Sequence, residues 1–309
     1  MPMTATKDIQ RIATIGMFDG VHRGHALLLD ELCRRAAAAS LVPTVFTFAD
    51  HPLRQIAPDK CPPLLTDIVA KEALLHSLLP VGAEVYILRF DAKMRAMSAA
   101  DFIDMLREDY DVRAIVRGHD HTFGHDRPSA DMLGRFAAAA GVQMSTAPVL
   151  LDETTGRAVC SSAIRRVIVS DGDMDAAARM LGRAYALVGK VVPGRRIGRT
   201  IGFPTANIRT DARMAVPRCG VYAATVDIAG RRYGAMLNIG TAPTVNAADT
   251  EVRLEVHIFD FDGDIYGATV SVEPRRYLRA ECRFADVSSL SARLRDDAAA
   301  AKAILAEIP

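Results

Sequence analysis

The stretch that decides the fold is RIATIGMFDGVHRGH, residues Arg11 to His25. It opens with a run of apolar residues, which predicts a buried β-strand over Arg11–Gly16. After a turn that contains glycine, apolar residues recur at helical spacing and predict a helix over Gly24–Ala39. A strand that passes through a short turn into a helix is the repeating unit of α/β proteins with parallel sheets.

The turn itself carries two glycines and two histidines. Gly20 and Gly24 allow the backbone to approach a ligand closely, and the free N–H groups at a helix start attract phosphate. His22 and His25 can donate hydrogen bonds to the α-phosphate of a nucleotide and stabilise the charge that develops as pyrophosphate leaves. An ordinary glycine turn with two surface histidines is the alternative, but the place directly after the first strand favours a nucleotide site.

The rest of the first half repeats the alternation of strand and helix. Apolar runs predict further strands, and helical spacing predicts helices between and after them. The strands are Pro43–Phe48, Glu84–Arg89 and Val112–Arg117, and the helices are Thr66–Leu79, Ser98–Glu108 and Asp131–Ala140. Thr66 is the expected N-cap of its helix. This order predicts an α/β, doubly wound parallel sheet, in which ligands bind at the carboxyl ends of the strands.

The pattern changes after about Leu181. Short β-type runs separated by turn residues predict an antiparallel barrel, closed or partly closed, followed by a terminal helix over Ser288–Glu307. Such runs extend from Tyr185 to Tyr277, and examples are Val221–Ile228, Arg232–Ile239, Arg253–Phe261 and Thr269–Val272. We therefore expect two domains, residues 1–183 and 184–309, with the boundary near Gly182–Ala184.

Composition restricts the partners. The 38 lysines and arginines nearly balance 37 aspartates and glutamates, which gives no sign of a nucleic-acid or membrane partner. The N-terminus resembles no signal peptide, and no apolar run is long enough to span a bilayer. Five scattered cysteines suggest neither a disulfide framework nor a zinc site, so a reducing cytoplasm is the expected location. The sequence leaves the oligomeric state open, and a homo-oligomer is compatible with it.

Three motifs of the first half occur in an order that resembles a known family. The stretch around His22 and His25 has the form GxFDGxHxGH. GHDHTFG, residues Gly118–Gly124, is similar to a GxDFxFG loop, and SSAIR, residues Ser161–Arg165, is similar to SSTxIR. Together they resemble the HxGH nucleotidyltransferases, and in particular the prokaryotic bifunctional riboflavin kinase/FAD synthetases. His121, Ala163 and Ser129 stand where that family usually has phenylalanine, threonine and glycine.

The resemblance implies that the first half transfers an adenylyl group from ATP to FMN, with His22 and His25 as catalytic residues. Ser161, Ser162 and Arg165 would hold the triphosphate. The full set of ligand-binding residues that it implies for this half is Gly16, Phe18, Asp19, Gly20, Gly24, Asp120, Phe123, Ser161, Ser162 and Arg165. Asp50-His51-Pro52 is similar to a PHP-like turn of the family and fits a plain capped turn equally well.

The second half carries GRTIGFPTAN, residues Gly198–Asn207, which resembles the riboflavin kinase signature. In that signature the PTAN residues organise ATP and Mg²⁺. Thr205 and Asn207 offer oxygen ligands of the hard type that magnesium requires. Pro204 would fix the turn, and Gly198 and Gly202 would bring the loop close to phosphate.

Glu255, in the stretch LEVHIFDF, matches the catalytic carboxylate of the family. As a general base it would take the proton from the 5′-hydroxyl of riboflavin. Arg279 and Glu281 resemble a pair of residues near the flavin, and a structural ion pair is an equal alternative. The resemblance implies a bifunctional enzyme whose substrates and products are ATP, riboflavin, FMN and FAD.

Two other functions stay open at this point. One is a riboflavin kinase whose first half is weak or regulatory, which the changes at Ala163 and His121 motivate. The other is a flavin-binding regulator without turnover. A general base such as Glu255 is of no use to a protein that only binds, so the enzyme is favoured.

Overall fold

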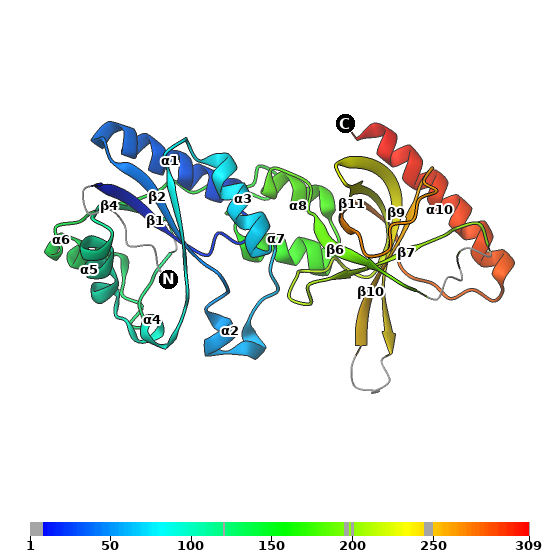
Figure 1. Cartoon of the computed structure of the whole chain (residues 1–309), viewed down its shortest axis with the longest axis horizontal. Coiled ribbons are helices and arrows are strands. Elements are labelled where there is room, and N and C mark those ends of the chain that lie inside the picture. Colours follow the sequence, from blue (N-terminus) through cyan, green and yellow to red (C-terminus); the bar gives the residue numbers. More distant parts are fainter. Residues whose placement is uncertain (1–8, 120, 195–197, 199–200, 244–249, 309) are drawn as a thin grey trace. The chain divides into compact units, whose positions relative to one another are not determined.

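The computed structural model describes residues 9–308, apart from residue 120 and residues 195–197, 199–200 and 244–249 (Figure 1). The chain divides into two compact units, Met1–Ser161 and Ser162–Pro309. The domain boundary that the sequence predicts after residue 183 stays a prediction. Among the helices described, none combines the length and the apolar character needed to cross a membrane.

Five parallel strands form the sheet of the first unit, in the order β3-β2-β1-β4-β5. Their bounds are β1 (Arg11–Ile15), β2 (Val42–Phe48), β3 (Glu84–Leu88), β4 (Val112–Arg117) and β5 (Gln143–Thr146). The first four agree with the predicted strands to within one residue. β5 was not predicted, because its sequence QMST is polar and its side chains are half-buried or exposed at the edge of the sheet.

Helices cover both faces of this sheet (Figure 1). Alternate side chains of β1 enter two different cores, because successive residues of a strand point to opposite faces. Ile12 packs in the cluster that contains Leu29 of α1, whereas Ile15 packs in the cluster that contains Phe102 of α5. The helices are α1 (Arg23–Ala39), α2 (Leu53–Ile56), α3 (Ile68–Leu78), α4 (Ala92–Ala96), α5 (Ala99–Asp109) and α6 (Ala130–Ala139), with a 3₁₀ turn η1 (Pro58–Lys60). The predicted doubly wound α/β fold is confirmed.

The N-terminus of α3 differs from the prediction. Asp67 is its N-cap, and the Asp67 carboxylate accepts a hydrogen bond from Ala70 N–H at 2.7 Å. Thr66, the predicted cap, lies one residue earlier, and its hydroxyl accepts a hydrogen bond from Gly20 N–H at 3.1 Å. The prediction was wrong by one residue because both side chains can cap a helix and only the tertiary contact separates them.

The second unit begins with short helices and continues as a barrel. The helices are α7 (Ser161–Arg166), which starts at the last residue of the first unit, a π-helical turn η2 (Val167–Asp171) and α8 (Met174–Leu181). Six antiparallel strands then close into a barrel in the order β10-β7-β6-β11-β8-β9. They are β6 (Leu187–Val192), β7 (Ala206–Thr210), β8 (Gly220–Ile228), β9 (Arg231–Pro243), β10 (Thr250–Ile258) and β11 (Thr269–Arg279).

The barrel has an apolar interior and carries a helix on its outer face. Leu254 and Val256 of β10 are buried, so Glu255 between them faces outward. The terminal helix α10 (Val287–Glu307) lies along the outside of the barrel (Figure 1). Its Ala301 packs in one apolar cluster with Val221 of β8. The predicted closed barrel with a terminal helix is confirmed.

Candidate active sites

The two histidines of the first unit hold each other in place. His22 is the N-cap of α1, and its Nδ1 accepts a hydrogen bond from His25 N–H at 3.2 Å. His25 Nδ1 in turn accepts one from His22 N–H at 3.3 Å, and the two rings stack with centroids 3.6 Å apart. A neutral imidazole that accepts at Nδ1 carries its proton on Nε2. Both histidines can therefore donate a hydrogen bond from Nε2.

The surroundings keep His25 neutral. Burial lowers the pKa of His25 well below its usual value, and the nearby basic groups of His22, His121 and Lys71 lower it further. A protonated ring would also carry hydrogen on Nδ1 and could not accept the bond from His22 N–H. The neutral state thus preserves the reciprocal cap at neutral pH.

The turn between β1 and α1 is strained. Gly20 has φ 83°, which glycine adopts readily, but Phe18 and Val21 have φ values of 48° and 36°. Positive φ is uncommon for an aromatic residue and an outlier for a β-branched one. Strained residues persist only where surrounding contacts fix them, and such residues concentrate at functional sites.

Side chains from distant parts of the sequence fix this turn. The carboxylate of Asp19 accepts hydrogen bonds from the N–H groups of Leu65 at 2.9 Å and Thr66 at 3.1 Å. Ser161 Oγ donates to the Asp19 carbonyl at 2.9 Å. Asp19 and Ser161 therefore support the turn through these contacts, and their predicted contact with nucleotide stays a prediction.

Close packing restricts two predicted glycines, Gly24 more strongly than Gly16. A Cβ at Gly24 would lie 2.8 Å from the carbonyl oxygen of Val159 and 3.1 Å from the ring of His22. A Cβ at Gly16 would lie 3.1 Å from the ring of Phe18. Both positions therefore shape the turn that presents the histidines.

A cavity of about 540 Å³ lies at the carboxyl ends of these strands. Its wall is mainly aromatic and thioether side chains with a few basic groups, which suits a flat ring system that carries a phosphate. The lining includes Met17, Phe48, Phe90, Phe102 and Phe123, together with His51, Arg95, His121, His125 and Arg127. Phe123 was predicted from the sequence, and His51 belongs to the turn that the sequence left open.

The remaining predicted residues of this half are placed as follows. Asp120 lies outside the described residues. Ser162 and Arg165 lie on α7 in the second compact unit, and their predicted contact with the triphosphate stays a prediction. Ser129, one of the departures from the family motif, is the N-cap of α6 and accepts a hydrogen bond from Met132 N–H at 3.3 Å.

In the barrel, three polar residues stand side by side. Glu255 of β10 pairs with Asn207 of β7 on one side and with Asn238 of β9 on the other. Directly opposed residues of antiparallel strands point to the same face. The predicted general base thus lies between two amides on the outer face of the barrel.

The loop before β7 is fixed by a histidine that the sequence did not assign to catalysis. His257 Nδ1 donates to the carbonyl of Pro204 at 2.8 Å, and its ring contacts that of Phe203. Phe203 N–H donates to the carbonyl of Gly198 at 2.8 Å, and Gly202 has φ 80°. His257 and the two glycines therefore set the position of the PTAN residues.

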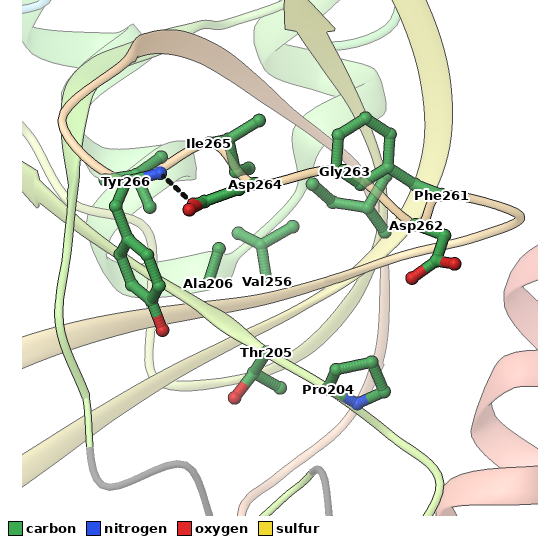
Figure 2. A pocket seen from close by; sticks show the side chains of 12 residues that line it. Pro204, Thr205, Ala206, Val256, Phe261, Asp262, Gly263, Asp264, Ile265 and Tyr266 are labelled. Atoms are coloured by element: carbon green, nitrogen blue, oxygen red, sulfur yellow. Dashed lines mark hydrogen bonds between the residues drawn. The ribbon is translucent and has the colours of Figure 1, made fainter.

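Three cavities are lined in part by these residues. Glu255, Arg279 and Phe284 line one of about 350 Å³. A second, of about 360 Å³, is lined by Pro204, Thr205, Val256, Asp264 and Tyr266, and Figure 2 shows Thr205 beside Pro204 on its wall. The third, of about 740 Å³, contains both Asn207 and Glu255. Thr205 lines both the first and the second cavity.

Arg279 has a partner that sequence reasoning missed. Its guanidinium donates to the buried carboxylate of Asp297 on α10, from Nε at 2.9 Å and from Nη2 at 2.6 Å. This hydrogen-bonded pair raises the pKa of Arg279 above its ordinary value. The Glu281 carboxylate accepts a hydrogen bond from Asn238 Nδ2 at 3.4 Å. Arg279 is thus part of an ion pair, but with Asp297, 18 residues further along the chain.

The fold and the sites together define a class: a two-unit phosphate-group transferase, with paired imidazoles at a helix start in one unit and a carboxylate beside a hydroxyl-bearing loop in the other. The riboflavin kinase family matches residues 181–305, and the FAD synthetase family matches residues 4–163. The chain belongs to the family of bifunctional riboflavin kinase/FMN adenylyltransferases.

Individual relatives cover nearly the whole chain. The bifunctional riboflavin kinase/FMN adenylyltransferase of Pseudomonas fluorescens is 36% identical, over 96% of this chain and 93% of its own length. The Bacillus subtilis enzyme of the same name is 31% identical, over 93% and 90%. A solved structure from Streptococcus pneumoniae, described as a macrolide-efflux protein, is 31% identical with a TM-score of 0.84 and covers 98% of both chains. The predicted bifunctional riboflavin kinase and FMN adenylyltransferase is confirmed.

Proposed function

We propose that the α/β unit transfers the adenylyl group through His22 and His25, and that the barrel transfers phosphate to riboflavin with Glu255 as its base. The observation that carries the first assignment is the reciprocal cap, which leaves both Nε2–H groups as donors. Donors held in advance at the place where charge develops stabilise a transition state without reorganisation. The α-phosphate of ATP would accept these two hydrogen bonds.

The aromatic cavity of the α/β unit would hold the ring system of FMN. Its lining includes Phe123 and His121, and His121 is near enough to His25 to lower the pKa of that histidine. The phosphate of FMN would therefore lie on the side of the histidines, where it attacks the α-phosphorus and pyrophosphate leaves.

In the barrel, riboflavin would occupy the cavity lined by Glu255 and Phe284, and ATP the cavity of Figure 2. Glu255 would accept the proton of the 5′-hydroxyl as that oxygen attacks the terminal phosphorus and ADP leaves. Thr205, which lines both cavities, would lie beside the transferred group.

The residues around Thr205 fit a magnesium ion bound together with ATP. No group of three or more His, Cys, Asp or Glu able to hold a metal occurs among the described residues. Mg²⁺ uses few protein ligands and keeps water and phosphate oxygens for the rest. Thr205 and Asn207 offer neutral hard oxygens, and Glu255 stands opposite Asn207. Bound there, Mg²⁺ would neutralise charge on the phosphates.

A double dissociation tests this division of labour. Glu255→Gln is expected to lower FMN formation by about 10²- to 10⁴-fold and to leave FAD formation from supplied FMN unchanged. His25→Ala is expected to do the reverse. Both are measured by chromatography of flavins after incubation with ATP and Mg²⁺. Loss of both activities in either folded variant would refute the assignment.

We propose that the protein is located in the cytoplasm. All five cysteines are described, and all five are free thiols, as a reducing compartment favours. The homo-oligomer that the sequence allows stays an expectation.

A further inference from the structure

A buried lysine lies behind the strained turn of the first unit. Lys71 of α3 is only 4% exposed. Its ammonium donates to the carbonyl of Phe48 at 2.6 Å and to the carbonyl of Met17 at 3.2 Å. These carbonyls belong to the end of β2 and to the residue that directly precedes Phe18. Lys71 therefore ties together the carboxyl ends of the two strands at which the site is built.

This contact is costly for a residue that only supports the fold. An ammonium taken out of water is unfavourable unless it is well compensated, and burial lowers the pKa of Lys71 although Asp19 and Asp50 oppose the shift. A methionine of similar length could fill the same space without that cost. The charge and the donors are therefore the properties that need an explanation.

The carbonyl of Met17 links Lys71 to the histidines. It accepts from Lys71 and also from Thr47 Oγ1 at 3.1 Å. From there the chain passes through Phe18 and Val21, both at positive φ, to His22. Since a strained segment keeps its conformation only while its contacts hold it, loss of the ammonium would let the turn relax and move the histidine pair.

We infer that Lys71 is a positioning residue for adenylyl transfer: its ammonium fixes the carbonyls of Met17 and Phe48, and thereby the place of the His22–His25 pair. It acts through the backbone and does not touch the nucleotide. The inference rests on the proposed role of the histidines in the α/β unit.

The test uses the full chain and the barrel as its internal reference. In Lys71→Met, kcat for FAD formation is expected to fall about a hundredfold, as misplacement by about 1 Å can cause. The KM for ATP is expected to stay within twofold, and FMN formation from riboflavin is expected to stay unchanged. Lys71→Arg keeps the positive charge and the hydrogen-bond donors, so its kcat for FAD formation is expected to be at least tenfold higher than that of Lys71→Met.

Arg11 provides a matched control. It is a fully buried cation on β1, at the end of that strand opposite the turn. Its guanidinium pairs with the carboxylate of Glu84 and donates to the carbonyls of Ile9 at 2.7 Å and Tyr110 at 2.9 Å. Arg11→Met is expected to lower the unfolding midpoint while the folded protein keeps its kcat for FAD formation. If Lys71→Met does the same, Lys71 is structural only and the inference is wrong.

The experiment also covers a Lys71→Met variant that does not fold and a wild-type protein that does not form FAD. Should Lys71→Met not fold, Lys71→Gln replaces it, and a kcat equal to that of Lys71→Arg would overturn the inference. A wild-type chain that forms FMN but no FAD would instead refute the proposed function of the α/β unit.

Discussion

Replacing Gly24 with alanine tests whether the histidine pair depends on close packing. Gly24 lies in the first turn of α1 at a helical backbone conformation, where alanine alone would stabilise the helix by about 1 kcal/mol. The added Cβ, however, would lie 2.8 Å from the carbonyl oxygen of Val159, where ordinary contacts begin at 3.4 Å. Relief therefore needs a shift of about 0.6 Å against backbone. Overpacking of this kind costs about 1–3 kcal/mol.

The same shift determines the effect on catalysis. The added Cβ also lies 3.1 Å from the ring of His22, which stacks on His25. Displacement of catalytic groups by about 1 Å can cost about a hundredfold in rate. A smaller shift should lower FAD formation about ten- to a hundredfold, which corresponds to about 1.4–2.7 kcal/mol in the barrier.

The assay is flavin chromatography with FMN, ATP and Mg²⁺, repeated with riboflavin in place of FMN. FMN formation reports on the barrel and should be unchanged. Gly134→Ala is the matched control, because Gly134 is also inside a helix, α6, and its added Cβ would meet no described atom within 4 Å apart from its chain neighbours and the backbone of its own helix. That control should raise the unfolding midpoint and leave FAD formation as it is. If Gly24→Ala behaves like Gly134→Ala in both respects, the packing argument is refuted.

Three other perturbations follow from the contacts described. Asp297→Asn removes the negative charge that faces Arg279 in a largely buried ion pair. The free energy of unfolding, measured by urea titration, should therefore fall by about 3 kcal/mol. An unchanged free energy of unfolding would contradict this. The pKa of His25 is lowered in the folded state, so the unfolded state binds more protons below about pH 6.5. The thermal stability of the α/β unit should therefore fall as pH drops below that value. A melting temperature that does not change with pH in this range would contradict the expectation. His121→Phe removes a neighbour that lowers the pKa of His25, so NMR titration should show that pKa rise, and a fall would be inconsistent.

Local sequence signals predicted the elements that carry a clear period. The strands around Arg11–Ile15 and Val112–Arg117 are apolar runs, and the structure confirms them closely. The strands Leu187–Val192 and Ala206–Thr210 lie within the region predicted to be of β type, but neither was delimited from the sequence. In the strand Leu187–Val192, buried and exposed residues alternate, and one of the buried residues is Gly189, which has no side chain. The apolar pattern of this strand is therefore short and weak. The second begins at Ala206, in the middle of PTAN, and that motif was interpreted as part of a loop.

The candidate sites were predictable to the extent that motifs are local. His22, His25 and Glu255 were found from a few neighbouring residues, and the structure places each at the predicted kind of position. Lys71 and Asp297 were not found. Each lies on a helix whose own sequence gives no reason for a charge to be buried, and each contacts a residue that only the tertiary fold brings near.

Both units use the same physical arrangement, in which a residue of the motif is held by a group outside it. His257 holds the carbonyl of Pro204, and Lys71 holds that of Met17. A motif therefore identifies which side chains face the substrate, whereas the rate depends also on supports that a motif does not contain. A departure such as Ala163 removes at most one neutral hydrogen bond, worth about 1 kcal/mol. Loss of a support such as Lys71 is expected to displace the two histidines proposed as catalytic, which can cost about a hundredfold in rate. On these magnitudes, the intact supports weigh more than the altered motif positions, which is the physical reason to expect two working active sites in this chain.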